Sequence, residues 1–265
     1  MIKLVITGAA GRMGRMLISL LAQEPELALA GAVEVPDSKA VGQDAGSVAA
    51  VGALGVPIRP DYAALAAPDT VTLDFTNAQA ALTHLEIAAA RGAAIAIGST
   101  GFDSEMMARV HALAPRTRTL IAPNMSLGVN VLSRLVSQVA AMLPEFDAEV
   151  IELHHRTKLD APSGTALALG RAVAAARGQD FEHNRVHGRQ GISGPRPEGQ
   201  IGVMALRGGD AVGDHTVLFC GAGERLELIH RTQSREALAR GALRAARWLA
   251  TQPNGLYSMA DVLGL

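Results

Sequence analysis

The chain has 265 residues, of which 49% are hydrophobic and 18% are charged, with a net charge of −1 and a pI near 6.7. A nearly neutral chain has no overall positive field, so we expect neither a nucleic-acid partner nor attraction to an anionic membrane. No apolar run reaches the ~18 residues of a membrane span. The single cysteine, Cys220, excludes an intrachain disulfide framework, and no secretory leader precedes the first strand-like segment, so we expect a cytoplasmic protein.

The first expected element is a buried strand over Ile2 to Thr7, because this segment is rich in apolar and β-branched residues. A glycine turn, Gly8-Ala9-Ala10-Gly11-Arg12-Met13-Gly14, follows it and leads into an apolar-periodic helix over 13–22. Strand, glycine turn and helix are typical of a dinucleotide-binding βαβ unit, in which a pyrophosphate lies at the helix N-terminus. Ala10 stands where the common fingerprint has its middle glycine, and such a turn alone is as often structural as functional.

A second strand is expected over 27–33, and Glu34 follows it. This carboxylate comes about 20 residues after the glycine turn, where an acidic residue holds the ribose hydroxyls in dinucleotide-binding domains. Without the turn, Glu34 would be interpreted as a solvated carboxylate at a strand end. Together the two features predict a nucleotide-binding unit. Residues 36–56 are expected to form a loop with weak structure.

Three further strands are expected over 71–75, 93–97 and 120–122, with helices over 78–91 and 104–114 between them. Each strand ends in small, polar or turn-forming residues, namely Asp74-Phe75-Thr76, Gly98-Ser99-Thr100-Gly101 and Pro123-Asn124-Met125-Ser126. Ligands of doubly wound sheets bind beyond the carboxyl ends of the strands. These three ends therefore predict a cofactor crevice, although any one of them alone would be a plain turn.

The second half predicts a different architecture. A helix over 127–143 is followed by a strand over 148–153, a helix over 166–176 and a glycine-rich polar loop over 178–199. The histidines and arginines of that loop, among them Arg189, are expected to be solvated. Alternating segments then predict a sheet, before a helix over 235–250; these segments are 201–206, 215–221 and 225–231. We therefore expect an α/β chain with a Rossmann-like doubly wound nucleotide domain and an α+β substrate domain whose mixed sheet is largely antiparallel.

The densest group of chemically active side chains lies between the strand over 148–153 and the helix that follows: His154, His155, Arg156 and Lys158. Histidine gives and takes protons near neutrality, and lysine delivers a proton or a positive charge from a flexible stem. Ser163 is placed to cap the helix, so that Gly164 and Thr165 open its first turn, where backbone N–H groups attract anions. The cluster predicts a pocket for a small carboxylate that undergoes proton transfer.

Two alternatives compete with this interpretation. A basic surface loop before an ordinary capped helix would explain any one of these residues, but binding sites concentrate on such junctions when the whole cluster is present. A zinc site is less favoured, because His154 and His155 are neighbours on a strand and point to opposite faces, and no His-Glu-x-x-His pattern occurs. We expect no metal.

The pattern His-His-x-x-Lys-x-Asp-x-Pro-Ser-Gly-Thr, from His154 to Thr165, resembles the signature of the 4-hydroxy-tetrahydrodipicolinate reductase family, also called dihydrodipicolinate reductases. The likeness continues from the N-terminus to the segment from Gly255 to Leu263, with Asp214 where a glutamate is frequent. The resemblance implies an NAD(P)H-dependent oxidoreductase of the diaminopimelate route to lysine. Its substrate would be the cyclic imine dicarboxylate formed from 4-hydroxy-tetrahydrodipicolinate by loss of water, and its product tetrahydrodipicolinate.

Carried over by motif position, the resemblance assigns proton transfer to His154 and Lys158, and substrate binding to His155, Gly164 and Thr165. The turn and the second strand predict coenzyme contacts at Gly8, Ala9, Ala10, Gly11, Arg12, Met13 and Glu34. The resemblance adds, on the nicotinamide side, Gly98, Ser99, Thr100, Ala122, Pro123, Asn124 and Met125, the last where some relatives carry an aromatic. We expect a dinucleotide-binding domain over 1–126 and 235–265. A substrate-binding and oligomerisation domain is expected over 127–234, and the resemblance implies a homotetramer.

Coenzyme preference is expected to favour NADH over NADPH. Glu34 repels a 2′-phosphate and Val35 offers it no charge, whereas Arg12 favours tolerance of NADPH. Two alternative functions remain: a non-catalytic NAD-binding regulator, against which the intact His154 and Lys158 argue, and a reductase of the same fold acting on another imine or ketone.

Overall fold

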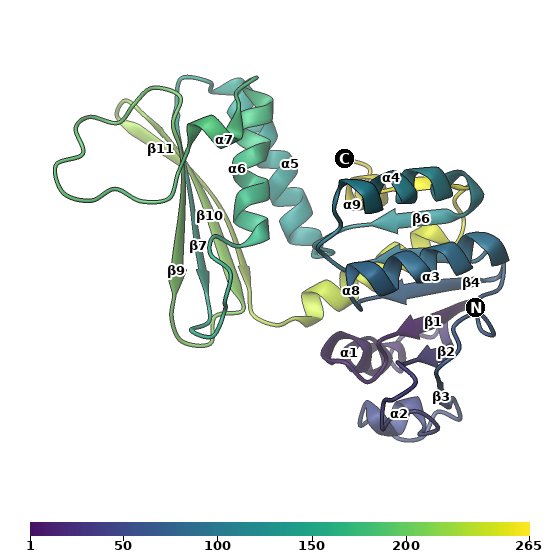
Figure 1. Cartoon of the computed structure of the whole chain (residues 1–265). Coiled ribbons are helices and arrows are strands. Elements are labelled where there is room, and N and C mark those ends of the chain that lie inside the picture. Colours follow the sequence, from purple (N-terminus) through teal and green to yellow (C-terminus); the bar gives the residue numbers. More distant parts are fainter. The chain divides into compact units, whose positions relative to one another are not determined.

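The computed structural model describes residues 1–265, and the chain folds into two compact units (Figure 1). The first unit contains Met1–Leu127 together with Glu236–Leu265, and the second contains Gly128–Arg235. None of the helices combines the length and the apolar character that crossing a membrane requires.

The first unit is built on a seven-stranded sheet in which every pair of neighbours is parallel. In spatial order its strands are β12 (Gly255–Tyr257), β6 (Arg118–Ile121), β5 (Ala94–Ile97), β4 (Thr70–Asp74), β1 (Ile2–Thr7), β2 (Leu27–Val33) and β3 (Ile58–Arg59). Strands β4 and β5 are buried at every position, and β5 is accordingly apolar throughout, whereas β4 also buries Thr70, Thr72 and Asp74. The predicted Rossmann-like fold class is confirmed.

Helices cover both faces of this sheet. Leu4 and Ile6 of β1 lie in one core cluster with residues of α1 (Arg12–Leu21) and α8 (Glu236–Leu249), whereas Val5 lies in a second cluster with α3 (Ala78–Arg91) and α4 (Ser104–Leu113). The alternation follows from the pleat of a strand, which points successive side chains to opposite faces. The short helices α2 (Ala45–Val48) and α9 (Met259–Leu263) and a 3₁₀ turn (Ala114–Arg116) complete the unit.

Three elements of the first unit are not among those expected from the sequence. Helix α2 lies inside the segment expected to be a loop, and strands β3 and β12 were not expected at all. Both strands have only two or three residues and occupy the two edges of the sheet, where they pair with β2 and β6. Such short segments become strands because their backbones pair with a neighbouring strand, and no local sequence pattern marks them.

The second unit contains a five-stranded mixed sheet. In spatial order its strands are β11 (Glu224–Thr232), β10 (Gly213–Gly221), β7 (Asp147–His154), β9 (Ile201–Arg207) and β8 (Arg185–Val186). Strand β10 is antiparallel to β11 and β7, but β9 runs parallel to β7 and β8. The parallel pairing requires a crossover, which α6 (Gly164–Ala176) and α7 (Phe181–Asn184) provide between β7 and β9.

One face of this sheet is covered by α5 (Leu127–Met142) and α6 (Figure 1). Val150, Val203 and Val217 from three neighbouring strands share a core cluster with these two helices. On the opposite face, a row of residues crosses the four strands β11, β10, β7 and β9 with no helix over it; the row consists of Ile229, Thr216, Ile151 and Met204. We call this side the open face.

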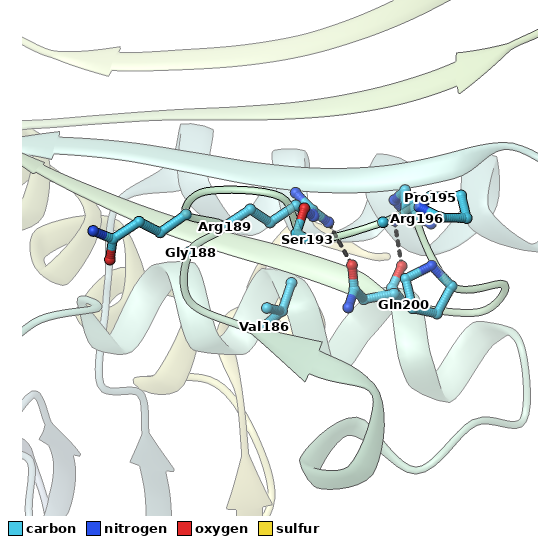
Figure 2. Close-up of a pocket in the computed structure, with 10 residues that line it drawn as sticks. Val186, Gly188, Arg189, Ser193, Pro195, Arg196 and Gln200 are labelled. Carbon is cyan, nitrogen blue, oxygen red and sulfur yellow. Dashed lines mark hydrogen bonds between the residues drawn. The ribbon is translucent and has the colours of Figure 1, made fainter.

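The loop over 178–199, expected to be solvated, contains α7 and β8 and is tied to the sheet by arginines. Arg189 and Arg196 both bond the Glu149 carboxylate, at 2.8 and 3.1 Å, and both reach Gln200. Figure 2 shows the hollow that this loop encloses, with Arg189 and Arg196 directed toward Gln200. Arg189 is exposed, as expected, and at the surface it pairs with Glu149 of β7.

Candidate active site

The predicted glycine turn closes tightly on the start of α1 in the first unit. Gly8 has a φ of +67°, which favours glycine. A Cβ atom on Gly14 would lie 2.2 Å from the carbonyl oxygen of Gly8, so no side chain fits there. Gly11 is the N-cap residue of α1, and no side chain caps this helix. The first backbone N–H groups of α1 are thus left to bind an anion, as a pyrophosphate site requires.

Glu34 lies next to this turn. Its Oε1 atom accepts a hydrogen bond of 2.8 Å from the backbone N–H of Ala10, and the N–H of Glu34 donates to the carbonyl of Arg59. The carboxylate is therefore held beside the glycine turn at the end of β2. Val35, the next residue, is 64% exposed and contributes no charge.

A buried carboxylate connects the other strand ends of the first unit. Asp74, at the end of β4, accepts hydrogen bonds from Thr7 of β1 (2.8 Å), Ser99 after β5 (3.2 Å) and His84 of α3 (2.6 Å). Burial alone raises the pKa of Asp74, but the bonds and charge of His84, with bonds from Thr76, outweigh it and leave the pKa below its ordinary value. The ends of β1, β4 and β5 are thus held together by one anion.

The residues expected on the nicotinamide side follow β5 and β6. Ser99 and Ala122 are nearly buried, the Ser99 hydroxyl is directed at Asp74, and Met125 is only 1% exposed in the core. A Cβ atom on Gly241 of α8 would lie 1.7 Å from the Met125 carbonyl oxygen, so a glycine is needed where α8 passes this segment. A hollow at the same sheet edge is lined by residues that include Ser99, Thr100, Phe102, Met107, Ile121 and Pro123.

Among the predicted coenzyme residues, the side chains of Ala9, Ala122 and Met125 are packed inside the first unit. Only their backbone atoms could meet a ligand. The remaining residues lie at the carboxyl ends of the parallel strands: the turn after β1, Glu34 after β2, Gly98 and Thr100 after β5, and Pro123 and Asn124 after β6.

The residues expected to carry protons lie in the second unit. His154 is the last residue of β7 and is 8% exposed, and its Nδ1 atom is bonded to the carboxylate of Glu152. Glu152 is fully buried two residues earlier on the same strand face. Its carboxylate also accepts hydrogen bonds from Arg207 Nη1 (2.9 Å) and from the backbone N–H of Ser163 (3.0 Å).

The ionised form of Glu152 is favoured by these partners. Burial alone would raise its pKa, but the hydrogen bonds from Arg207, His154 and the Ser163 backbone outweigh burial and lower the pKa below its ordinary value. A negative charge therefore lies directly behind His154 across the neutral pH range.

Lys158 and His155 follow β7 in a turn. The Lys158 ammonium donates to the Asp160 carboxylate at 2.8 Å, and Arg207 Nη2 donates to the backbone carbonyl of Asp160 at 2.6 Å. His155 is more exposed than His154, and its Nδ1 atom lies 2.8 Å from the hydroxyl of Thr157. The two adjacent histidines thus have separate environments, because β7 ends at His154 and His155 lies in the turn after it rather than on the strand.

Helix α6 begins at Gly164, and Ser163 caps it as predicted: the Ser163 hydroxyl accepts a hydrogen bond from the Ala166 backbone N–H. No atom lies within 4 Å of the place where a Cβ on Gly164 would be, so the first turn is open beside this glycine. Thr165 follows in the same turn and is half-buried. Backbone N–H groups and a hydroxyl therefore meet at the helix end.

His215 of β10 belongs to the same cluster, although the sequence analysis did not place it there. Its Nε2 atom lies 3.2 Å from the Ser163 hydroxyl, and its ring packs edge-on against His154 with the centroids 5.3 Å apart. Burial, and then the neighbouring His154, lower the pKa of His215 to about 4. His215 is therefore neutral at physiological pH.

Three residues of this cluster were not among those expected from the sequence: Glu152, Arg207 and His215. Glu152 had a detectable signal, because it lies two residues before His154 on a strand and so shares its face. Arg207 had none, because it reaches the site only through the parallel pairing of β7 with β9, in which Arg207 lies opposite His154.

Two family models match the chain. The N-terminal part of dihydrodipicolinate reductase matches residues 2–125, and the C-terminal part matches residues 128–263. The chain belongs to the dihydrodipicolinate reductase family. A 4-hydroxy-tetrahydrodipicolinate reductase of Anaeromyxobacter sp. (strain Fw109-5) is 53% identical over 266 residues, covering 100% of this chain and 98% of the relative. One of Syntrophus aciditrophicus is 46% identical over 265 residues, covering 100% and 99%.

Among solved structures, this dihydrodipicolinate reductase family member is similar to a dipicolinate-bound dihydrodipicolinate reductase from Paenisporosarcina sp. TG-14. The TM-score is 0.79 at 24% identity, and 98% of each chain is covered. At this identity the match shows that the two chains share a fold.

Proposed function

We propose that this chain reduces the cyclic imine dicarboxylate derived from 4-hydroxy-tetrahydrodipicolinate to tetrahydrodipicolinate, with NAD(P)H as coenzyme, in the diaminopimelate route to lysine. Full-length relatives at 53% and 46% identity carry the corresponding name. The single observation that carries the proposal is that the Glu152 carboxylate is hydrogen-bonded both to His154 and to the Ser163 backbone N–H at the start of α6. A group that can carry a proton and a helix end that can bind an anion are therefore close together.

The residues of the first unit fit a nicotinamide dinucleotide. The uncapped start of α1 suits a pyrophosphate, and Glu34 beside the turn suits ribose hydroxyls. The bound coenzyme would supply a hydride to the substrate ring. Glycines at 8 and 14 allow the close backbone approach that a pyrophosphate needs, and Asp74 keeps the neighbouring strand ends in place.

The residues of the second unit provide the proton and the substrate contacts. Electrons that enter a ring conjugated with an imine move toward the nitrogen, which must then be protonated. His154 is placed to give this proton, with Lys158 as a second carrier. The backbone N–H groups of Gly164 and Thr165 and the Thr165 hydroxyl suit a substrate carboxylate, and His155 would contribute a further polar contact.

NADH is proposed as the preferred coenzyme, with NADPH tolerated. The Glu34 carboxylate beside the turn would repel a 2′-phosphate, and the exposed Val35 offers no compensating charge. Arg12, exposed at the start of α1, is the cation that favours NADPH.

A homotetramer assembled through the open face is also proposed. Ile229 of β11 on this face is 48% exposed and Leu206 of β9 is 52% exposed, and apolar surface of this kind marks interfaces. Light scattering should give four times the chain mass, and Ile229→Glu should give smaller species. The net charge of only −1 and the single cysteine support a cytoplasmic protein without nucleic-acid or membrane partners.

The decisive experiment follows coenzyme oxidation by the pure protein, at the absorbance of the reduced nicotinamide. The substrate is generated in the cuvette from aspartate semialdehyde and pyruvate by the preceding synthase. Oxidation that depends on both precursors is expected. A folded protein that binds the coenzyme but does not oxidise it in this mixture would contradict the proposed function.

A further inference from the structure

The buried carboxylate of Glu152 is bonded to three separate parts of the second unit. Its Oε2 atom is bonded to His154 Nδ1 and to Arg207 Nη1, and its Oε1 atom accepts from the Ser163 backbone N–H. These partners come from the end of β7, the end of β9 and the start of α6. Because Glu152 has no exposed surface, it cannot touch a substrate and must act through the groups it holds.

The bond to Glu152 determines which nitrogen of His154 can react. An ionised carboxylate only accepts hydrogen bonds, so Nδ1 of His154 carries a hydrogen in both protonation states of the ring. The exchangeable proton must then be the one on Nε2. Gly213 of β10 leaves room at this atom, since a Cβ there would lie 3.0 Å from His154 Nε2.

Arg207 extends the same assembly to the second proton carrier. It pairs with the Glu152 carboxylate through Nη1 (2.9 Å), and its Nη2 atom donates to the Asp160 carbonyl (2.6 Å). The side chain of Asp160 accepts from the Lys158 ammonium. A guanidinium is suited to this task because its planar fork bonds two acceptors in fixed directions.

We propose that Glu152 and Arg207 form the positioning pair of this site: they keep the reactive proton of His154 on Nε2 and fix the Lys158 turn and the start of α6 relative to it. The inference rests on the proposed function, since it is about the proton transfer of that reaction. Neither residue is proposed to contact the substrate.

The main variant is Glu152→Gln, which keeps the shape but removes the charge and offers His154 an amide that can donate. We expect kcat to fall about a hundredfold, within the range of general-acid effects, with the coenzyme dissociation constant unchanged. Because Glu152 acts in part through His154, Glu152→Gln should slow turnover by a smaller factor in the His154→Ala background than in the wild type. Glu152→Asp, which keeps the charge, should recover part of the lost turnover.

Glu149→Gln is the matched control. Glu149 lies on the same strand and is also bonded by arginines, but these are Arg189 and Arg196 of the loop rather than groups of the cluster. Its turnover should equal that of the wild type. Arg207→Lys keeps a charge without the fork, and Arg207→Met keeps neither, so turnover should decrease in that order.

Wild-type turnover by Glu152→Gln, or losses that multiply in the double variant, would overturn the positioning role. Wild-type protein that fails to reduce the substrate would instead overturn the proposed function, so the two failures are distinguishable. Circular dichroism and coenzyme binding report whether each variant is folded. If Glu152→Gln does not fold, Glu152→Asp combined with His154→Ala gives the same test of additivity.

Discussion

The Nδ1 atom of His84 lies 2.6 Å from the Oδ2 atom of Asp74, a carboxylate with no exposed surface at the end of β4. The Asp74 carboxylate also accepts hydrogen bonds from the hydroxyls of Thr7 and Ser99. It therefore links the ends of β1, β4 and β5 to helix α3. Burying a charge destabilises a protein unless hydrogen bonds or an opposite charge compensate it. Here the compensating hydrogen bonds also hold the strand ends of the expected coenzyme site together.

Asp74→Asn should lower the free energy of unfolding at neutral pH by about 2–4 kcal/mol, because it breaks a buried charged network. The pKa of Asp74 is lowered in the folded protein, so this stabilisation is present above the ordinary pKa and is lost as the pH falls through the folded value. Below about pH 4 the variant should therefore approach the wild type. Denaturant unfolding at several pH values measures both effects.

The control for this prediction is Asp69→Asn. Asp69 pairs with Lys3 on the surface, where both side chains are more than half exposed. Its removal should change stability little at any pH, because exposed ion pairs are screened by solvent. Equal effects of the two variants would show that Asp74 is not an energetic centre of the first unit.

His154→Ala and Lys158→Ala should each reduce kcat roughly a hundred- to ten-thousand-fold, the usual contribution of general acid catalysis. Coenzyme affinity should be almost unchanged, because the expected coenzyme residues lie in the first unit. Steady-state kinetics and a fluorescence titration with the reduced coenzyme separate the two quantities. Normal turnover in both variants would exclude these residues as proton carriers, and a collapse of coenzyme binding would make them structural.

Thr165→Val should raise the Michaelis constant for the substrate while kcat changes less. The hydroxyl at the start of α6 is proposed to bond a substrate carboxylate, and one charge-assisted hydrogen bond contributes about 1.5–3 kcal/mol. Initial rates over a range of substrate concentrations give both constants. If the Michaelis constant does not change, the start of α6 must face something other than the substrate.

The ratio of kcat/KM with NADH to that with NADPH should exceed one in the wild type. Val35→Arg should shift the ratio toward NADPH by supplying a guanidinium next to the 2′-phosphate, and Arg12→Ala should shift it toward NADH. Val35→Gln is a control of similar length without charge and should shift it less. A wild type that strongly prefers NADPH would contradict the interpretation of Glu34 and Val35.

The sequence predicted the long elements well because their signals are local. Asn77 caps α3, and Gly92 ends it in the left-handed conformation, as the glycine predicted. Ser163 caps α6, also as predicted, because its hydroxyl can accept a hydrogen bond from a backbone N–H of the first turn. The two-residue strands β3 and β8 carry no such signal, and the parallel partner of β9 could not be predicted, because strand pairing is a contact between residues far apart in the chain.

In the candidate site, too, local features could be predicted from the sequence and contacts between distant residues could not. The sequence by itself predicted which residues carry protons and which helix start binds an anion, because residue chemistry and capping are properties of short segments. Only the tertiary structure decided that Glu152 is fully buried, that it bonds His154 and Ser163, and that Arg207 lies opposite His154 on the neighbouring strand. The burial of Glu152 and the parallel register of β7 and β9 determine which partners the Glu152 carboxylate has. Both features arise only when strands that are distant in the chain pair with each other.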